Sequence, residues 1–320
     1  MRRGHHAGRL FVTACPVEWF QLSEEEKHGS LVTSSRIERP LGADERSSVR
    51  VTGARSSEAM PTIILCGGRG TRISGVDLML PKPMLPIGER PILWHIMKVY
   101  AAFGHTDFVL ALGWHSREIK EYFLNFGVLT SDFSITLGPH PDITFLGDAL
   151  ELDWRVTCVD TGVDSLTGTR VRLAARHAGD GPIMVTYGDG VGDVDIARLL
   201  EFHQAHGRLA TVTAVRPPGR FGELRLGAGG RVRSFDEKPQ TSTGAINGGF
   251  MVFEREAIER YIPADRDVML EREPLDGLAR AGELVAYEHK GFWQPMDTPR
   301  ERDLLNGLWE SGKAPWKVWS

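Results

Sequence analysis

A short apolar segment that runs directly into a glycine-rich turn, within residues 60–87, restricts the fold of this chain more than any other feature. Residues 62–66 have the length and composition of a buried parallel strand. Three of the next four residues are glycine. Such glycines let the backbone approach a ligand closely, and their N–H groups can surround an anion. Because Arg72 and Lys82 lie beside this turn, the segment predicts a site for a polyphosphate.

Two familiar phosphate-binding turns do not match this segment. The dinucleotide-binding fingerprint needs a third glycine at the position of Ile73, and the Walker loop needs a Gly-Lys-Ser/Thr sequence that is absent here. The turn is therefore a different kind of phosphate-binding loop. An oxidoreductase that binds a nicotinamide dinucleotide is disfavoured for the same reason.

Strand and helix periodicities alternate from Met60 onward. The predicted strands are residues 107–112, 155–159, 182–187 and 209–215, and the predicted helices are residues 91–103, 116–126, 170–177 and 195–206. This alternation predicts an α/β fold with a Rossmann-like, doubly wound, mostly parallel sheet and right-handed crossovers. The intervening segment 131–154 is less regular and is predicted to be an insertion or a loop-rich stretch.

The second half of the chain, from Pro217, is richer in glycine and in short apolar runs. The sequences FGELRL, RVRSFDEK and GGFMVF predict a smaller mixed β region that forms a lid over the strand ends. Helices are predicted at residues 256–261, 274–281 and 299–309.

Composition excludes several classes of partner. The formal net charge of -4 gives no general attraction to nucleic acid or to an anionic membrane surface. No apolar run approaches the ~20 residues that span a bilayer. The three cysteines form no CxxC pair, so we expect reduced thiols in a cytoplasmic protein.

Residues 1–59 differ from the remainder, because they carry scattered charges and one short apolar patch. We interpret them as a largely disordered N-terminal extension, with Met60 as a credible alternative start and residues 60–320 as the working domain. The Arg2-Arg3 pair and the patch after it superficially resemble a signal peptide, but Pro16 interrupts the patch and no A-x-A cleavage site follows.

Polar clusters lie after several predicted strands, where ligands bind in open α/β sheets. Asp189, in TYGDG after strand 182–187, can hold Mg²⁺, although an aspartate before glycine more often binds its own backbone in a turn. Similar clusters are DEKP at 236–239, NGG at 247–249 and MDT at 296–298. Each cluster alone also fits an exposed turn, and on local sequence that interpretation is favoured.

Taken together, these motifs resemble the sugar-1-phosphate nucleotidyltransferases, also called nucleoside-diphosphate-sugar pyrophosphorylases. Within that family they are most similar to the glucose-1-phosphate cytidylyltransferases. The resemblance covers Met60 to the C-terminus. The motifs that carry it are GGRGTR at 67–72, PKPM at 81–84, TYGDGVGD at 186–193, INGGF at 246–250 and GFWQPMDT at 291–298.

The resemblance implies roles for the residues at matching positions. Arg72, Lys82 and Asp189 are implied to be catalytic, and Asp189 with Asp297 to hold Mg²⁺. The implied nucleotide-binding residues are Leu65, Gly67, Gly68, Gly70, Thr71, Arg72, Lys82, Thr167, Arg170 and Gly188. The implied sugar-phosphate-binding residues are Gly222, Glu237, Lys238 and Asn247.

The activity implied by the resemblance is transfer of the cytidylyl group of CTP to glucose 1-phosphate, which gives CDP-glucose and pyrophosphate. The family context implies a homo-oligomer that supplies precursors for deoxysugars of bacterial surface polysaccharide, such as lipopolysaccharide O-antigen. Composition does not separate this from a thymidylyl- or uridylyltransferase, or from an enzyme acting on another sugar 1-phosphate. A non-catalytic nucleotide-sugar-binding subunit is less favoured, because the charged residues of the motifs are all present.

Overall fold

The computed structural model describes residues 59–68, 80–137, 142–146, 151, 153–216, 223–226, 232–236 and 244–320. The predicted disordered extension lies outside these residues except for Ala59. Much of the predicted phosphate-binding turn, from residue 69 to residue 79, also lies outside them.

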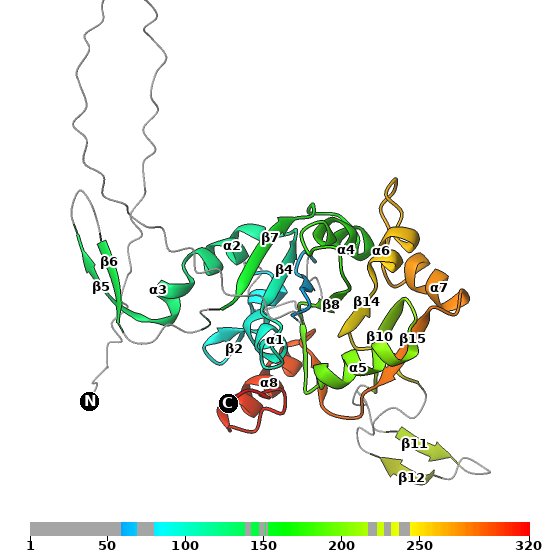
Figure 1. Ribbon diagram of the computed structural model, residues 1–320. Coiled ribbons are helices and arrows are strands. Elements are labelled where there is room, and N and C mark those ends of the chain that lie inside the picture. The colour runs from blue at the N-terminus through cyan, green and yellow to red at the C-terminus, as the bar shows by residue number, and fades with distance from the viewer. Residues whose placement is uncertain are drawn as a thin grey trace, which may run out of the picture. The chain divides into compact units, whose positions relative to one another are not determined.

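An eight-stranded sheet forms the centre of the described chain, in the order β13–β10–β14–β8–β1–β4–β7, with β15 paired to β10 (Figure 1). The strands are β1 (Thr62–Leu65), β4 (Asp107–Leu112), β7 (Arg155–Asp160), β8 (Ile183–Tyr187), β10 (Ala210–Val215), β13 (Ile246–Asn247), β14 (Met251–Phe253) and β15 (Leu284–Glu288). Parallel pairs join β1 to β4 and β8, β4 to β7, and β10 to β15. β14 runs antiparallel to β8 and β10, and β13 runs antiparallel to β10. The predicted mostly parallel sheet is confirmed.

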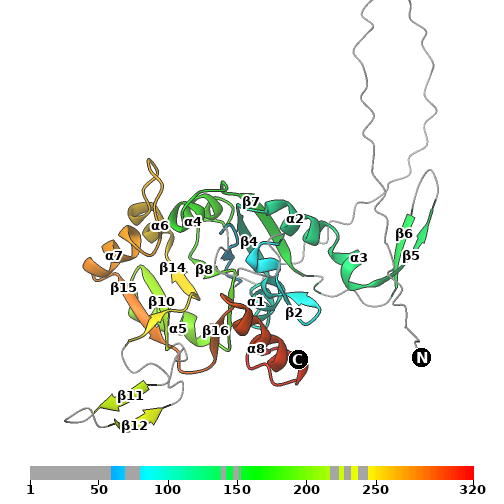
Figure 2. The same cartoon turned by 180° about the vertical axis from the view of Figure 1, so that it is seen from behind.

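Helices cover both faces of this sheet, as the two opposite views show (Figures 1 and 2). Ile64 of β1 packs in one core with the helices α1 (Ile92–Ala101), α5 (Ile196–His206) and α8 (Pro299–Glu310). Ile63 and Leu65 pack in a second core with α4 (Thr167–Ala175), α6 (Arg255–Tyr261) and α7 (Glu273–Arg280). Successive side chains of a strand point to opposite faces, which is why one strand feeds two cores.

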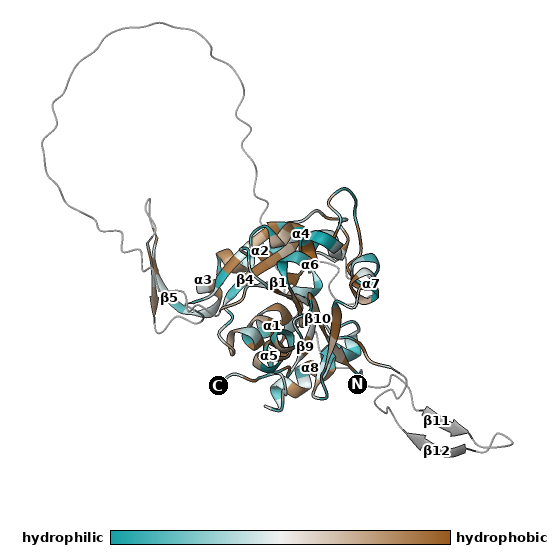
Figure 3. Ribbon diagram, turned by 45° about the vertical axis from the view of Figure 1, so that its right-hand side comes forward, coloured by the Kyte–Doolittle hydropathy of each residue, from teal (hydrophilic) through white to brown (hydrophobic). Residues whose placement is uncertain are grey.

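The central strands are mostly apolar, because both of their faces are buried (Figure 3). All four residues of β1 are buried, and Ile63 and Ile64 are fully inaccessible to solvent. A continuous apolar run is thus the sequence signature of a strand at the middle of the sheet.

Two expectations about irregular regions differ from the structure. Within segment 131–154, β5 (Asp132–Thr136) and β6 (Asp142–Leu146) form an antiparallel hairpin, and α3 (Phe126–Thr130) precedes it, after α2 (Ser116–Leu124). The sequence GGFMVF is not part of a lid, because β14 lies inside the main sheet between β10 and β8. Its three strand residues are fully apolar, and both neighbouring strands cover its edges.

Several short elements complete the described chain. β11 (Glu223–Leu226) and β12 (Val232–Asp236) form an antiparallel pair of their own. The remaining elements are η1 (Lys82–Met84), β2 (Pro86–Ile87), β3 (Arg90–Pro91), β9 (Gly190–Gly192) and β16 (Trp293–Pro295). Among the helices that the structure describes, none has the length and apolarity needed to cross a membrane.

The topology places a ligand site at the carboxyl end of β1. The chain continues from β1 to β4 on one side, and β8 pairs with β1 on the other side. A strand order that reverses in this way opens a crevice at the carboxyl ends of the strands, where open α/β sheets bind ligands.

Candidate active site

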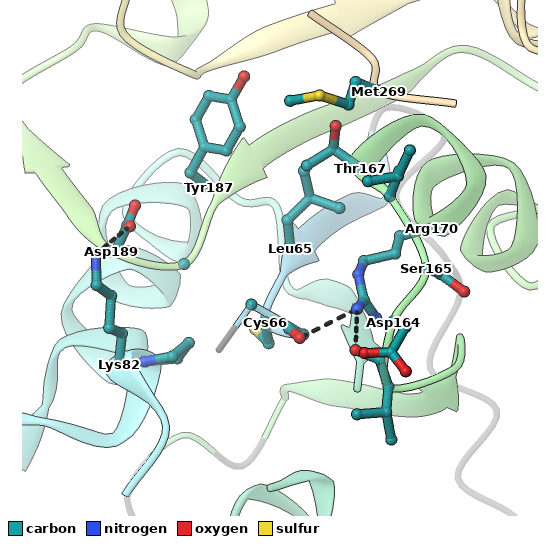
Figure 4. A pocket seen from close by; sticks show the side chains of 16 residues that line it. Leu65, Cys66, Lys82, Asp164, Ser165, Thr167, Arg170, Tyr187, Asp189 and Met269 are labelled. Carbon is teal, nitrogen blue, oxygen red and sulfur yellow. Dashed lines mark hydrogen bonds and ion pairs between the residues drawn. The ribbon is translucent and has the colours of Figure 1, made fainter. Parts of the chain in front are cut away.

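A cavity of about 370 Å³ opens at the carboxyl ends of β1 and β8 (Figure 4). Its volume is at the lower end of the range for small-molecule sites, ~300–1,000 Å³. Lys82 and Asp189 lie on one side of it, and Ser165, Thr167 and Arg170 lie on the other. The predicted nucleotide-binding residues that line it are Leu65, Gly67, Gly68, Lys82, Thr167, Arg170 and Gly188.

Three charged side chains from distant parts of the sequence converge beside this cavity. The Nζ of Lys82, in η1, donates to Asp189 Oδ2 at 3.5 Å and also binds Asp297 Oδ1. Only 13% of the Lys82 side chain and 17% of the Asp297 side chain are exposed, so solvent screens this contact weakly. The structure therefore brings together three of the four residues predicted to act as catalytic groups or metal ligands.

The β9–β16 ladder brings the two aspartates together. Gly190 pairs with Pro295, and Met296 N donates to Asp189 O at 2.7 Å. Asp189 and Asp297 are therefore held at the same end of this ladder. The two motifs that carry them, TYGDG and PMDT, are adjacent only in the folded chain.

A capping box fixes the backbone at Asp297. The Thr298 side chain accepts from Glu301 N at the start of α8, and Glu301 Oε2 accepts from Thr298 N at 2.9 Å and from Asp297 N at 2.8 Å. The sequence T-P-R-E has the spacing that this motif requires. The carboxylate of Asp297 thus projects from a helix start that its own sequence stabilises.

The electrostatics of the pair favour a bound cation. Burial raises the pKa of Asp189, and Asp297 raises it further, whereas the ammonium of Lys82 lowers it. Two carboxylates that converge on one ammonium form a site with an excess of negative charge and oxygen ligands. Mg²⁺ prefers such ligands, and it commonly takes one or two carboxylates with the remainder from phosphate and water. The residues present fit that ion.

Arg170 binds the loops around the cavity rather than standing free within it. Its guanidinium donates five hydrogen bonds of 2.7 to 3.1 Å, and the side chain is almost fully buried. The acceptors are the carbonyls of Gly67, Leu112, Gly162 and Val163 and the Thr161 hydroxyl. Burial lowers the pKa of Arg170, while Asp267 and other acidic groups nearby oppose that shift. The contacts show Arg170 holding the glycine turn to the ends of β4 and β7; its predicted contact with the nucleotide stays a prediction.

Two glycines make room for this guanidinium. A Cβ added to Gly67 would lie 2.1 Å from Arg170 Nη1, and one added to Gly113 would lie 2.4 Å from it. Gly188 is equally confined, because its Cβ would lie 2.8 Å from the carbonyl oxygen of Leu65. The glycines at these positions serve close packing of the loop, in addition to any approach to a ligand.

The INGGF motif joins the same site through two hydrogen bonds. Asn247 Nδ2 donates to the hydroxyl of Tyr187 at 3.2 Å, directly before Gly188 and Asp189. Trp293 Nε1 donates to the carbonyl of Gly248 at 2.7 Å, which ties the motif to β16. The predicted sugar-binding residue Asn247 thus lies one hydrogen bond from the cavity wall, and its role stays a prediction.

Six predicted site residues lie outside the residues that the structure describes. They are Gly70, Thr71, Arg72, Gly222, Glu237 and Lys238. Their assignments remain predictions from the sequence.

The sequence interpretation missed one segment of the site, residues 267–271, which we call the strap. Val268 O accepts from Gly168 N at 3.0 Å and from Thr169 N at 3.3 Å, and so caps the start of α4. Met269 lines the cavity, and Glu271 binds Thr167 and Tyr187. The strap has neither helical nor strand periodicity, so no sequence pattern pointed to it.

Comparison with known proteins shows the family to which the chain is similar. The family described as Nucleotidyl transferase matches residues 61–298. A glucose-1-phosphate cytidylyltransferase of Salmonella typhimurium is 48% identical over 262 residues, which are 81% of this chain and 100% of that protein. A mannose-1-phosphate guanylyltransferase of Mycobacterium tuberculosis is 29% identical, over 79% of this chain and 67% of that protein.

Solved structures share the fold at low sequence identity. HddC from Yersinia pseudotuberculosis superimposes with a TM-score of 0.58 and 22% identity, over 78% of this chain and 99% of that chain. That likeness supports the α/β architecture alone. The match over 61–298 and the full-length relative at 48% identity decide the family. The chain therefore belongs to the nucleotidyl transferase family.

Proposed function

We propose that this chain transfers the cytidylyl group of CTP to glucose 1-phosphate, forming CDP-glucose and releasing pyrophosphate. The observation that carries the proposal is the convergence of Lys82, Asp189 and Asp297 beside a cavity at the carboxyl end of β1. The choice of substrates rests on the relative at 48% identity, which is named for CTP-dependent chemistry on glucose 1-phosphate.

The reaction is an in-line displacement at phosphorus. An oxygen of glucose 1-phosphate forms a bond to the α-phosphorus of CTP, and the bond from that phosphorus to the bridging oxygen of the β-phosphate breaks. The electron pair leaves with pyrophosphate. Because a phosphate monoester is already ionised at neutral pH, no general base is needed. Catalysis of this kind rests on positioning and on neutralising charge.

Lys82 and the two aspartates would have separate roles in neutralising the charge of the phosphates. The ammonium of Lys82 would lie against the α-phosphate, where negative charge builds up in the transition state. Asp189 and Asp297 would hold Mg²⁺, which supplies a Lewis acid and a template for the two substrates. Within the described ranges no cluster of three or more histidine, cysteine or acidic residues competes as a metal site.

The other assignments follow the sequence motifs. The backbone of Gly67, Gly68 and Gly70 would line the nucleotide, and Thr71 and Arg72 would hold the departing phosphates. Lys238 would neutralise the phosphate of the sugar. Gly222, Glu237 and Asn247 would bind the hydroxyl groups of glucose. We further propose a homo-oligomer in the cytoplasm that supplies deoxysugar pathways of bacterial surface polysaccharide.

The test is release of pyrophosphate from glucose 1-phosphate with CTP, UTP, dTTP and GTP in separate reactions. We expect the highest kcat/KM with CTP. Asp189→Ala should reduce turnover at least ~100-fold, since a metal ligand and its charge are lost. The matched control is Asp180→Ala at an exposed position, which should leave turnover unchanged. Preference for UTP or dTTP would refute the cytidylyl assignment, and full activity of Asp189→Ala would refute the metal assignment.

A further inference from the structure

Glu271 of the strap binds two hydroxyl groups of the cavity wall at once. Thr167 Oγ1 donates to Glu271 Oε2 at 2.6 Å, and the Tyr187 hydroxyl donates to Glu271 Oε1 at 2.6 Å. Both lengths are those of hydroxyl groups donating to an ionised carboxylate. Thr167 and Tyr187 both line the cavity, from α4 and from the end of β8 (Figure 4).

The two hydroxyl oxygens also accept hydrogen bonds from the chain. Leu270 N donates to Thr167 Oγ1 at 2.9 Å, and Asn247 Nδ2 donates to the Tyr187 oxygen at 3.2 Å. A hydroxyl group has one proton to donate, and here Glu271 receives it in both cases. Toward a ligand in the cavity, Thr167 and Tyr187 therefore offer only lone pairs.

The strap holds Glu271 in place through the backbone. Besides the two bonds to Val268 O, Val268 N donates to Thr169 Oγ1 at 3.2 Å, and Leu166 N donates to Asp267 Oδ1 at 3.0 Å. These bonds attach the first two residues of the strap to the start of α4, and the bond from Leu270 N to Thr167 Oγ1 attaches its other end. The carboxylate is thus fixed relative to the hydroxyl groups that it orients.

A cavity wall that can only accept hydrogen bonds would distinguish cytosine from uracil and thymine. Cytosine carries an exocyclic amino group, which donates, at the position where uracil and thymine carry a carbonyl oxygen, which accepts. Lone pairs of Thr167 and Tyr187 would pair with the amino group and face an acceptor in the other two bases. A buried acceptor left without a donor is costly, so the wrong base loses affinity.

We propose that Glu271 is a positioning residue that sets the nucleotide preference, by directing the protons of Thr167 and Tyr187 away from the cavity. The inference rests on the proposed function, because it explains a preference for CTP. Glu271 acts through the two hydroxyl groups and does not touch the substrate.

The test compares kcat/KM for CTP and UTP at saturating glucose 1-phosphate. In Glu271→Gln, the amide donates to one hydroxyl group and frees its proton to point into the cavity, so the ratio of CTP to UTP should fall about tenfold. Tyr187→Phe removes one acceptor and should lower kcat/KM for CTP without lowering it for UTP. The matched control is Glu273→Gln, which alters an exposed carboxylate paired with Arg266 just beyond the strap and should keep the wild-type ratio.

Each outcome bears on a separate claim. If Glu271→Gln lowers both values in parallel, or changes neither, the inference is overturned while the proposed function stands. If the wild-type protein turns over glucose 1-phosphate but fails to prefer CTP, the proposed function is contradicted before any variant is measured. A thermal unfolding midpoint equal to wild type shows that a changed ratio reflects the site and not the fold.

Discussion

At the floor of the cavity, Gly67 and Gly68 are adjacent glycines with different space around them. A Cβ at Gly67 would lie 2.1 Å from Arg170 Nη1, whereas a Cβ at Gly68 would meet nothing within 4 Å. We expect Gly67→Ala to displace the guanidinium from its carbonyl acceptors and to cost about 3 kcal/mol of unfolding free energy. Gly68→Ala should change stability by less than ~0.5 kcal/mol. Urea unfolding of the two variants measures the difference, and equal losses would contradict the packing described for Arg170.

His95 is buried without charge in a cluster of tryptophan side chains. His95 Nε2 donates to Ile87 O at 3.0 Å, while His95 Nδ1 accepts from Trp316 Nε1 at 3.4 Å. A proton added to Nδ1 would break the second of these hydrogen bonds, so the imidazole is held in its neutral form. Burial lowers the pKa of His95 from 6.5 to about 4. The unfolded chain therefore takes up a proton at a higher pH than the folded chain does.

The sign of the pH dependence follows from that pKa. His95 favours the folded state fully above pH 6.5, and this stability is lost as the pH falls toward about 4. The loss amounts to on the order of 3 kcal/mol. His95→Gln should be less stable than wild type at pH 7 and should lose less stability on acidification, as measured by urea unfolding at pH 7 and pH 4.5. An unchanged pH dependence in the variant would show that His95 does not contribute in this way.

At the scale of elements, the start of α8 positions one carboxylate of the charged cluster. Thr298→Ala removes the side-chain acceptor for Glu301 N and should cost about 1 kcal/mol. Because Asp297 directly precedes this cap, we also expect weaker binding of Mn²⁺, measured by electron paramagnetic resonance with Mn²⁺ as the probe.

The matched control for that experiment is the cap of another helix. Asp195 accepts from Arg198 N at 3.0 Å at the start of α5. Asp195→Ala should lose a similar free energy of unfolding and leave Mn²⁺ binding unchanged. If both variants bind Mn²⁺ as wild type does, the capping box does not position the metal ligand.

The sequence predicted the elements with clear periodicity and missed those that other strands define. β1, β4 and β8 were predicted almost to their ends, since each is a continuous apolar run between polar turns. β14 was predicted as part of a lid, because three apolar residues after two glycines do not reveal which strands flank them. Its central place depends on pairing with β8 and β10, which no local pattern encodes.

The same difference between local patterns and contacts of distant segments explains which parts of the site were predicted and which were missed. Lys82, Asp189 and Asp297 belong to motifs that resemble a known family, so their convergence was expected before the structure. Glu271 meets Thr167 and Tyr187 across sequence separations of 104 and 84 residues, from a strap without periodicity. Only the folded chain shows that contact.

At the scale of the whole molecule, exposed apolar side chains gather on the β5–β6 hairpin. Phe133, Ile135, Ile143 and Phe145 are each between 38% and 47% exposed. Apolar clusters of this kind mark contact surfaces, and two strands alone are marginally stable in water. We therefore expect light scattering to give a native mass that is a multiple of 35.5 kDa.

A charge on this hairpin should disrupt the assembly. Phe145→Lys is expected to lower the native mass, whereas Leu304→Lys, at a similarly exposed position on α8, should not. A wild-type mass of 35.5 kDa would contradict the proposed homo-oligomer.

The most direct test of the proposed activity is a competition among nucleotides in a single reaction. Purified protein, Mg²⁺ and limiting glucose 1-phosphate are mixed with equal concentrations of CTP, UTP, dTTP and GTP, and the sugar nucleotides are quantified by mass spectrometry. The proposed function predicts that CDP-glucose is the dominant product, formed in equal amount with pyrophosphate. A dominant UDP-, dTDP- or GDP-linked sugar, or no sugar nucleotide at all, would contradict it.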